Sequence, residues 1–183
     1  EVPLAAHQVV NSVWGLAAFA LDALAIAAQA LVGHGLGARQ PDTVRAVVRR
    51  CLRWGTIAGA ALGAVIAGLG WVLTPLFTSD PTVQHAATLG LVVIGVLLPV
   101  AAWPYMLDGV LMGAGDGAYL AWAGGIALVV YLPMLLAVWA WAPGGALGLV
   151  WLWISFAGGY MAARAVTTWL RARGSRWMVL GAD

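Results

Sequence analysis

Apolar residues fill five long stretches of the chain, and short segments rich in glycine, proline and polar residues separate them. The stretches cover approximately residues 4–36, 54–73, 86–112, 119–141 and 146–170. About 20 residues of α-helix cross a hydrocarbon core of about 30 Å, so each stretch is long enough to span a membrane. Because the breaks between them are short, consecutive helices are expected to be antiparallel. The pattern therefore predicts an all-α integral membrane protein with a five-helix transmembrane bundle.

Polar and small residues share one side of the first predicted helix. They are Gln8, Asn11, Gly15, Asp22, Gln29 and Gly33, and at about 100° per residue they fall within a stripe of roughly 60°. A charge at the centre of a membrane helix costs about 3 kcal/mol, so Asp22 is expected to face a protein interior or a wet cavity. Asp22, Gln29 and Asn11 are therefore candidates for lining a substrate or ion cavity. Hydrogen bonding between helices is the structural alternative for all three.

Two prolines interrupt the third predicted span, and an acid follows them. Pro99 and Pro104 each remove a backbone N–H donor, which favours a kink of the kind that transporters use where helices bend or line a cavity. Pro133 is a weaker form of this signal in the fourth span. Asp108 is thus a second candidate for the cavity, and a packing kink beside a hydrated carboxylate is the alternative.

Composition supports a membrane location and argues against several other classes. The chain is 63% hydrophobic and 9% charged, with a mean hydropathy of +0.92, values far from those of soluble domains. Its basic residues are all arginines near the ends of apolar segments, with no aromatic-interleaved basic face, so we expect the lipid bilayer and no nucleic acid as a partner. With one cysteine, and histidines whose spacing does not suggest ligation, no metal site or cofactor is expected.

The arginines predict the orientation of the bundle. They fall into two groups, one around the first break and one at the end of the fifth span: Arg39, Arg45, Arg49, Arg50 and Arg53, then Arg164, Arg171, Arg173 and Arg176. The positive-inside rule places both groups, and the C-terminus, on the cytoplasmic side. We expect Arg45, Arg49, Arg50 and Arg53 to anchor a helix start in the anionic inner leaflet, with Asp42 as its N-cap, and Arg164 to snorkel towards the headgroups.

The opposite interface is expected to carry a belt formed by Trp139, Trp141, Trp151 and Trp153. The same topology places the N-terminus outside, yet the chain begins at Glu1 without an initiator methionine or a signal sequence. We therefore expect at least one further helix upstream, and a fragment of a longer, transporter-sized protein.

Four segments resemble a known transporter family in order and spacing. They are residues 5–8, residues 21–25 with 28–33, residues 76–78 followed by Asp80, and residues 108–116. They are similar to the C-terminal lobe of a multidrug and toxic compound extrusion (MATE) transporter, in the branch named for the DNA-damage-inducible F protein. Members of that family have twelve helices in two lobes. The resemblance implies that the five spans are helices 8–12, and that helix 7 and the N-terminal lobe lie outside this chain.

The resemblance also implies an activity. Such proteins are antiporters, not enzymes: they export amphipathic, often cationic, drug-like compounds in exchange for protons or sodium ions by alternating access. The expected location is a bacterial plasma (inner) membrane. In this branch the proton is thought to be carried by an aspartate of the first helix, in the absent lobe, so the coupling ion stays open.

Three other functions compete with efflux. A flippase for a lipid-linked substrate belongs to the same superfamily, but such proteins typically place several basic residues in the cavity. Residues 113–116 match the GxGD pattern of intramembrane aspartyl proteases, in which two carboxylates share a proton. However, Asp116 falls in a glycine-rich turn instead of a span. A non-transporting membrane scaffold would leave unexplained why the chain tolerates the energetic cost of a charged Asp22 within a span.

Overall fold

The computed structural model describes residues 2–181, and all the regular structure in that part of the chain is helical. The helices are α1 Val2–Gly37, α2 Pro41–Leu73, α3 Pro81–Gly113, α4 Gly117–Trp141, α5 Ala146–Trp153 and α6 Met161–Ala172. A short 3₁₀ helix, Thr74–Leu76, follows α2, and a π-helix, Ile154–Tyr160, joins α5 to α6. Counting Ala146–Ala172 as one, five helices are long and apolar enough to cross a membrane. The predicted five-helix membrane fold is confirmed; Glu1, Ala182 and Asp183 lie outside the described residues.

Two helices begin earlier than the apolar pattern indicates. α2 starts at Pro41 instead of residue 54, because proline suits the first helical position and no helix breaker follows before the apolar part. Its N-cap is Gln40, so the expectation that Asp42 caps this helix was wrong; Asp42 instead pairs with Arg45 at 3.3 Å. α3 starts at Pro81, where the Asp80 carboxylate accepts a hydrogen bond from the Thr82 backbone N–H at 2.8 Å.

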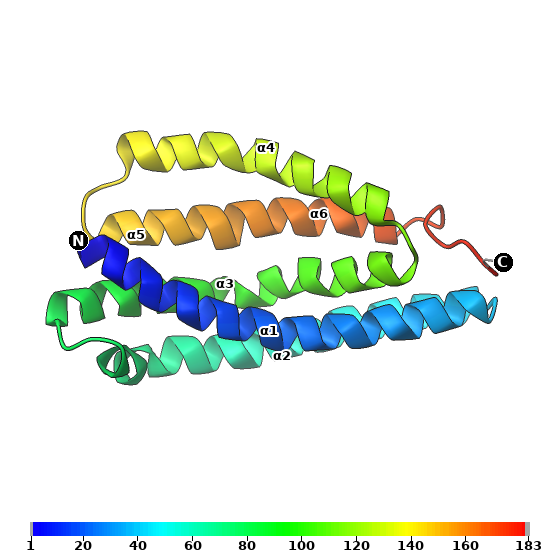
Figure 1. Cartoon of the computed structure of the whole chain (residues 1–183), viewed down its shortest axis with the longest axis horizontal. Helices are drawn as coiled ribbons and strands as arrows, with labels where there is room; N and C mark the ends of the chain where they lie inside the picture. The colour runs from blue at the N-terminus through cyan, green and yellow to red at the C-terminus, as the bar shows by residue number, and fades with distance from the viewer. Residues whose placement is uncertain (1, 182–183) are drawn as a thin grey trace.

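Consecutive helices alternate in direction, and α3 lies at the centre of the bundle (Figure 1). α1 and α2 pack against it on one side, and α5 and α6 pack against it on the other. α4 packs mainly on the π-helix and α6, and in its most apolar window 11% of the residues are buried, against 50% in α3. The α1–α2 turn, the α3–α4 turn and the end of α6 lie at one end of the bundle, on the right in Figure 1. Both arginine groups therefore belong to this same end.

Glycines let the backbones of neighbouring helices touch. On α2, a Cβ at Gly59 would lie 2.9 Å from the carbonyl oxygen of Leu98, and one at Gly63 would strike the backbone of α3. On α3, Gly109 faces the backbone of Ala25 and Gly113 faces that of Gln29. Small residues allow such close approach in membrane bundles. The contacts at Gly109 and Gly113 therefore fix the register of α1 against α3.

The expected tryptophan belt includes one wrong member. Trp139 and Trp141 are 85% and 75% exposed, but Trp153 is only 3% exposed and belongs to the core. Trp151, which is 43% exposed, and Trp153 are two residues apart and therefore point to nearly opposite sides of their helix. Only one of the two can face the surroundings, and Trp153 packs inward against α1.

Candidate functional site

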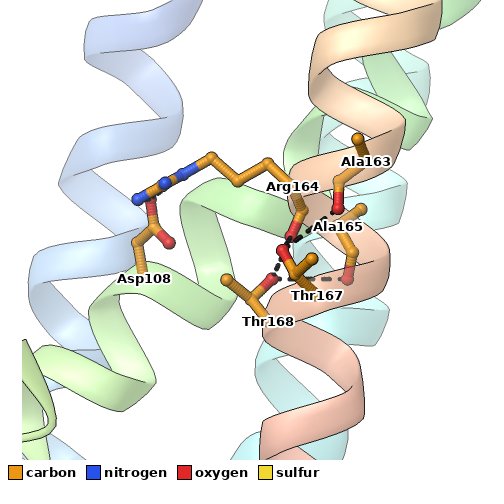
Figure 2. A network of polar contacts seen from close by, with 6 residues as sticks. All are labelled: Asp108, Ala163, Arg164, Ala165, Thr167 and Thr168. Carbon is orange, nitrogen blue, oxygen red and sulfur yellow. Dashed lines mark hydrogen bonds and ion pairs between the residues drawn. The ribbon is translucent and has the colours of Figure 1, made fainter. Parts of the chain in front are cut away.

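An ion pair between α3 and α6 lies inside the bundle. Arg164 donates hydrogen bonds from Nε and Nη2 to Oδ2 of Asp108, at 3.0 and 2.9 Å, and its side chain extends across the gap between the two helices (Figure 2). The side chains of Arg164 and Asp108 are 18% and 29% exposed. The expected snorkelling of Arg164 towards the headgroups is thus not what the structure shows. A charge within a span is more cheaply neutralised by an opposite charge on a neighbouring helix.

The same pair leaves one acceptor unused. Oδ1 of Asp108 is buried and has no hydrogen-bond partner within residues 2–181. An ionised carboxylate can accept about four hydrogen bonds, and a buried acceptor without a partner is costly. Such an atom is suited to hold a proton, a water molecule or a cation.

Asp22 lies on the part of α1 that packs against α3 close to Asp108. It precedes Ala25 by about one helical turn, and Ala25 touches Gly109, the residue that follows Asp108. Asp22 is also close enough to interact electrostatically with both Asp108 and Tyr105. The packing of α1 on α3 thus brings together the two acids that the sequence singled out. We call Asp22, Tyr105, Asp108 and Arg164 the acidic cluster.

The polar stripe of α1 stays uncovered by the described part of the chain. Asn11, Asp22 and Gln29 are all exposed, whereas the buried residues of α1, such as Val10, Leu21 and Val32, face the core. Of the stripe, Asp22 alone belongs to the acidic cluster. The stripe is nevertheless an open polar surface along one helix of an otherwise apolar bundle.

The three candidate prolines lie within continuous helices. Pro99 and Pro104 are inside α3, and Pro133 is inside α4, so neither helix ends at a proline. Pro104 is buried, and the backbone of Pro99 lies against Gly59 of α2. The kinks themselves stay a prediction.

A second ion pair joins the α3–α4 turn to the end of α6. Nε of Arg171 donates to Oδ2 of Asp116 at 2.7 Å, and its guanidinium lies 4.9 Å from the ring centroid of Tyr119. The Tyr119 hydroxyl donates to the backbone carbonyl of Thr167 at 2.8 Å. Asp116 is therefore held by an arginine in a turn, away from the acidic cluster. This arrangement does not provide the pair of carboxylates sharing a proton that an aspartyl protease needs.

Sequence reasoning missed an aromatic cavity at the other end of the bundle. A cavity of about 240 Å³ is lined by His7, Asn11, Tyr131, Leu152, Trp153 and Phe156, and we call it the aromatic cavity. The Trp153 ring centroid lies 5.5 Å from that of His7 and 5.7 Å from that of Phe156. Nδ1 of His7 and Nε1 of Trp153 are buried without a hydrogen-bond partner within residues 2–181.

Two signals could have indicated this cavity. His7 and Asn11 are four residues apart and so lie on one face of α1, and aromatic residues recur along residues 151–160. The spacing of the histidines gave no ligating role to His7, and Trp153 was assigned to the aromatic belt. Asn11, expected beside Asp22, contributes to the aromatic cavity instead of the acidic cluster.

Comparison with known proteins gives consistent results. The family model MatE matches residues 1–142. The chain is 33% identical to Protein DETOXIFICATION 43 of Arabidopsis thaliana over 171 residues, which cover 90% of this chain and 30% of that protein. It is 31% identical to DNA damage-inducible protein F of Escherichia coli (strain K12) over 111 residues, which cover 61% of this chain and 24% of that protein. The chain thus spans about a third of the length of the first of these curated relatives. No solved structure gives a significant match.

Proposed function

Because the chain belongs to the MatE family, we propose that it forms part of a multidrug exporter. This exporter would move amphipathic organic cations out of the cell in exchange for protons or sodium ions. The five helices would be helices 8–12 of a twelve-helix, two-lobed transporter, and the open polar stripe of α1 would face the cavity between the lobes. The membrane would be a bacterial plasma membrane, with the arginine-bearing end and the C-terminus in the cytoplasm.

The acidic cluster is the observation that carries this proposal. It contains two carboxylates and one guanidinium, so it bears a net negative charge when both acids are ionised. Asp108 is already paired with Arg164, whereas Asp22 lies on the exposed stripe and is available as a counter-charge for a cation. The free Oδ1 of Asp108 provides a nearby acceptor for a proton or a sodium ion. In this scheme Asp22 attracts the substrate or ion, and Asp108 responds to the change in local charge.

The aromatic cavity suits the other half of an amphipathic cation. Ring faces attract cations and also pack against apolar groups. Tyr131, Trp153 and Phe156 provide such faces, and the exposed edge at Asn11 continues the polar stripe towards Asp22. A ligand that lies along α1 would therefore meet aromatic rings at one end and a carboxylate at the other.

Pairing within the acidic cluster argues against a flippase for a lipid-linked pyrophosphate. Such a substrate needs unpaired basic groups in the cavity, and the guanidinium of Arg164 is engaged by Asp108. The net charge of the cluster also has the wrong sign for a polyanion.

Efflux of a cationic dye from proteoliposomes that contain the full-length protein tests the proposal. Asp22→Asn removes the counter-charge and should reduce efflux by about tenfold, since losing one charge-assisted contact costs on the order of 1.4 kcal/mol. Asp42→Asn is the matched control, because Asp42 is an exposed acid whose one ion pair within residues 2–181 is the surface contact with Arg45. Equal efflux rates for the well-folded Asp22→Asn protein and the wild type would refute the role of Asp22.

A further inference from the structure

A basic pocket lies between the start of α2 and the end of α6, away from the acidic cluster and the aromatic cavity. Its volume is about 250 Å³, and the residues that define it here are Arg45, Arg49, Leu52, Trp169, Arg173 and Trp177. We call it the arginine pocket. Three arginines thus line one small cavity in a chain that has nine arginine and lysine residues.

Trp177, one of the residues that line the pocket, is held in place by hydrogen bonds and packing. Trp177 follows α6 and is only 2% exposed, and its indole N–H donates to the carbonyl oxygens of Ala172 and Gly174, at 3.1 and 2.8 Å. The ring packs in one cluster with Val44 and Val48 of α2. This packing holds the segment after α6 against the first turns of α2, so arginines far apart in the sequence share one cavity.

Among residues 2–181, few groups compensate the charge of the pocket. Arg45 pairs with Asp42, but at 3.3 Å and with side chains 52% and 94% exposed, which makes this a weak surface contact. The Arg173 guanidinium lies 5.1 Å from the ring centroid of Trp169, a contact that orients the group without neutralising it. Arg49 also borders a second basic hollow, shared with Arg50 and Arg53, which extends the positive surface. An anion that accepts hydrogen bonds from several guanidinium groups would complete the site.

The surroundings of the pocket are those of a membrane interface. Trp54 and Trp169 are 59% and 39% exposed, and tryptophan side chains favour the headgroup level. Towards the middle of the membrane the surface becomes apolar: Ile57 on α2 and Val166 on α6 are 46% and 54% exposed. The arginine pocket therefore opens beside surface that acyl chains can cover.

We propose that the arginine pocket binds the phosphate of an anionic phospholipid headgroup, with the acyl chains lying on the apolar surface of α2 and α6 next to it. Arg49 and Arg173 approach the phosphate from the two helices, and Arg45 adds a more exposed contact. A soluble phosphate ester shares the same headgroup chemistry, but it would leave the adjoining apolar surface uncovered. The bound lipid would join α2 to the last helix at the arginine-bearing end.

Native mass spectrometry of the full-length protein in detergent tests this proposal. We expect phosphatidylglycerol to be retained at least about fivefold more than phosphatidylcholine, because each arginine near an anionic headgroup contributes about a fivefold preference. The double variant Arg49→Gln/Arg173→Gln should lose this preference. Arg176→Gln is the control for losing one positive charge at the same end of the bundle: Arg176 is not among the pocket-lining residues, so this variant should keep the preference. Equal retention of both lipids by the wild type, or an equal loss in Arg176→Gln, would overturn the proposal.

Competition with sn-glycerol 3-phosphate separates the two sources of phosphate. A lipid site predicts that phosphatidylglycerol stays bound when the soluble ester is in large excess, because the ester lacks acyl chains. Displacement of the lipid at equal concentrations would assign the pocket to a soluble phosphate and overturn the lipid assignment.

If the double variant fails to fold, Arg49→Lys gives a second test. Lysine keeps the charge but lacks the two-pronged donor geometry of arginine. Phosphatidylglycerol retention should then fall at an unchanged melting temperature, and unchanged retention would count against a defined pocket.

Discussion

The ion pair between Asp108 and Arg164 should contribute measurably to stability, and the contribution should depend on both partners. Arg164→Met keeps an apolar stem but removes the guanidinium, and so it leaves a largely buried carboxylate without a partner. Breaking a buried pair from one side costs about 3–5 kcal/mol. Because the two side chains are 18% and 29% exposed, we expect a value near the lower limit, about 3 kcal/mol.

A double-mutant cycle separates this coupling from the effects of the single changes. Asp108→Asn leaves the arginine without a counter-ion and should cost about 2 kcal/mol. The double variant contains neither charge, so its loss should be smaller than the sum of the single losses, with a coupling energy of about 1–2 kcal/mol. Reversible unfolding of the full-length protein in mixed micelles, titrated with sodium dodecyl sulfate, measures all four free energies of unfolding. Losses that add to within about 0.5 kcal/mol would refute the pairing.

Two further outcomes follow from the helix contacts and from the start of α3. Gly109→Val should destabilise the bundle by about 2 kcal/mol in the same unfolding assay, because its side chain would strike the backbone of Ala25. Gly125→Val, where a Cβ meets open space, should change little, and equal losses would contradict the contact. Hydrogen bonds from Thr82 hold the pKa of Asp80 below its usual value of 3.8. The stabilisation from this cap is therefore present above pH 3.8 and is lost as pH falls through the lowered pKa. Asp80→Ala should remove that acid-sensitive component, and identical acid unfolding curves for both proteins would exclude it.

Much of the fold could be predicted because membrane helices are defined by length and hydropathy. The five spans all follow from local sequence. The apolar pattern alone places the start of α2 too late, since residues 41–53 carry charges but no helix breaker. Hydropathy marks where a chain is apolar, whereas a helix ends only where its backbone is interrupted.

The partners within the site were harder to predict, because hydropathy does not fix the rotation of each helix about its axis. Arg164 is near enough to the end of its span to reach the interface, and only the packing of α6 on α3 turns it towards Asp108. Trp153 was assigned to the aromatic belt because the sequence does not show which side of its helix faces the core. Asp22 was identified because the energetic cost of a charge within an apolar helix can be inferred from the sequence of that helix alone. Its proximity to Asp108, in contrast, depends on the register of α1 against α3.

The π-helix in the last span determines how far α6 is rotated about the helix axis relative to α5. In an uninterrupted α-helix, Trp153 and Arg164 would be separated by slightly more than three whole turns and would point in nearly the same direction. Each π turn contains more residues than an α turn, so Ile154–Tyr160 rotates everything that follows it about the helix axis. Trp153 can thus pack on His7 of α1 while Arg164 reaches Asp108 of α3. The aromatic cavity and the acidic cluster are therefore mechanically linked: any tightening of these seven residues into α-helix would turn one out of alignment with the other.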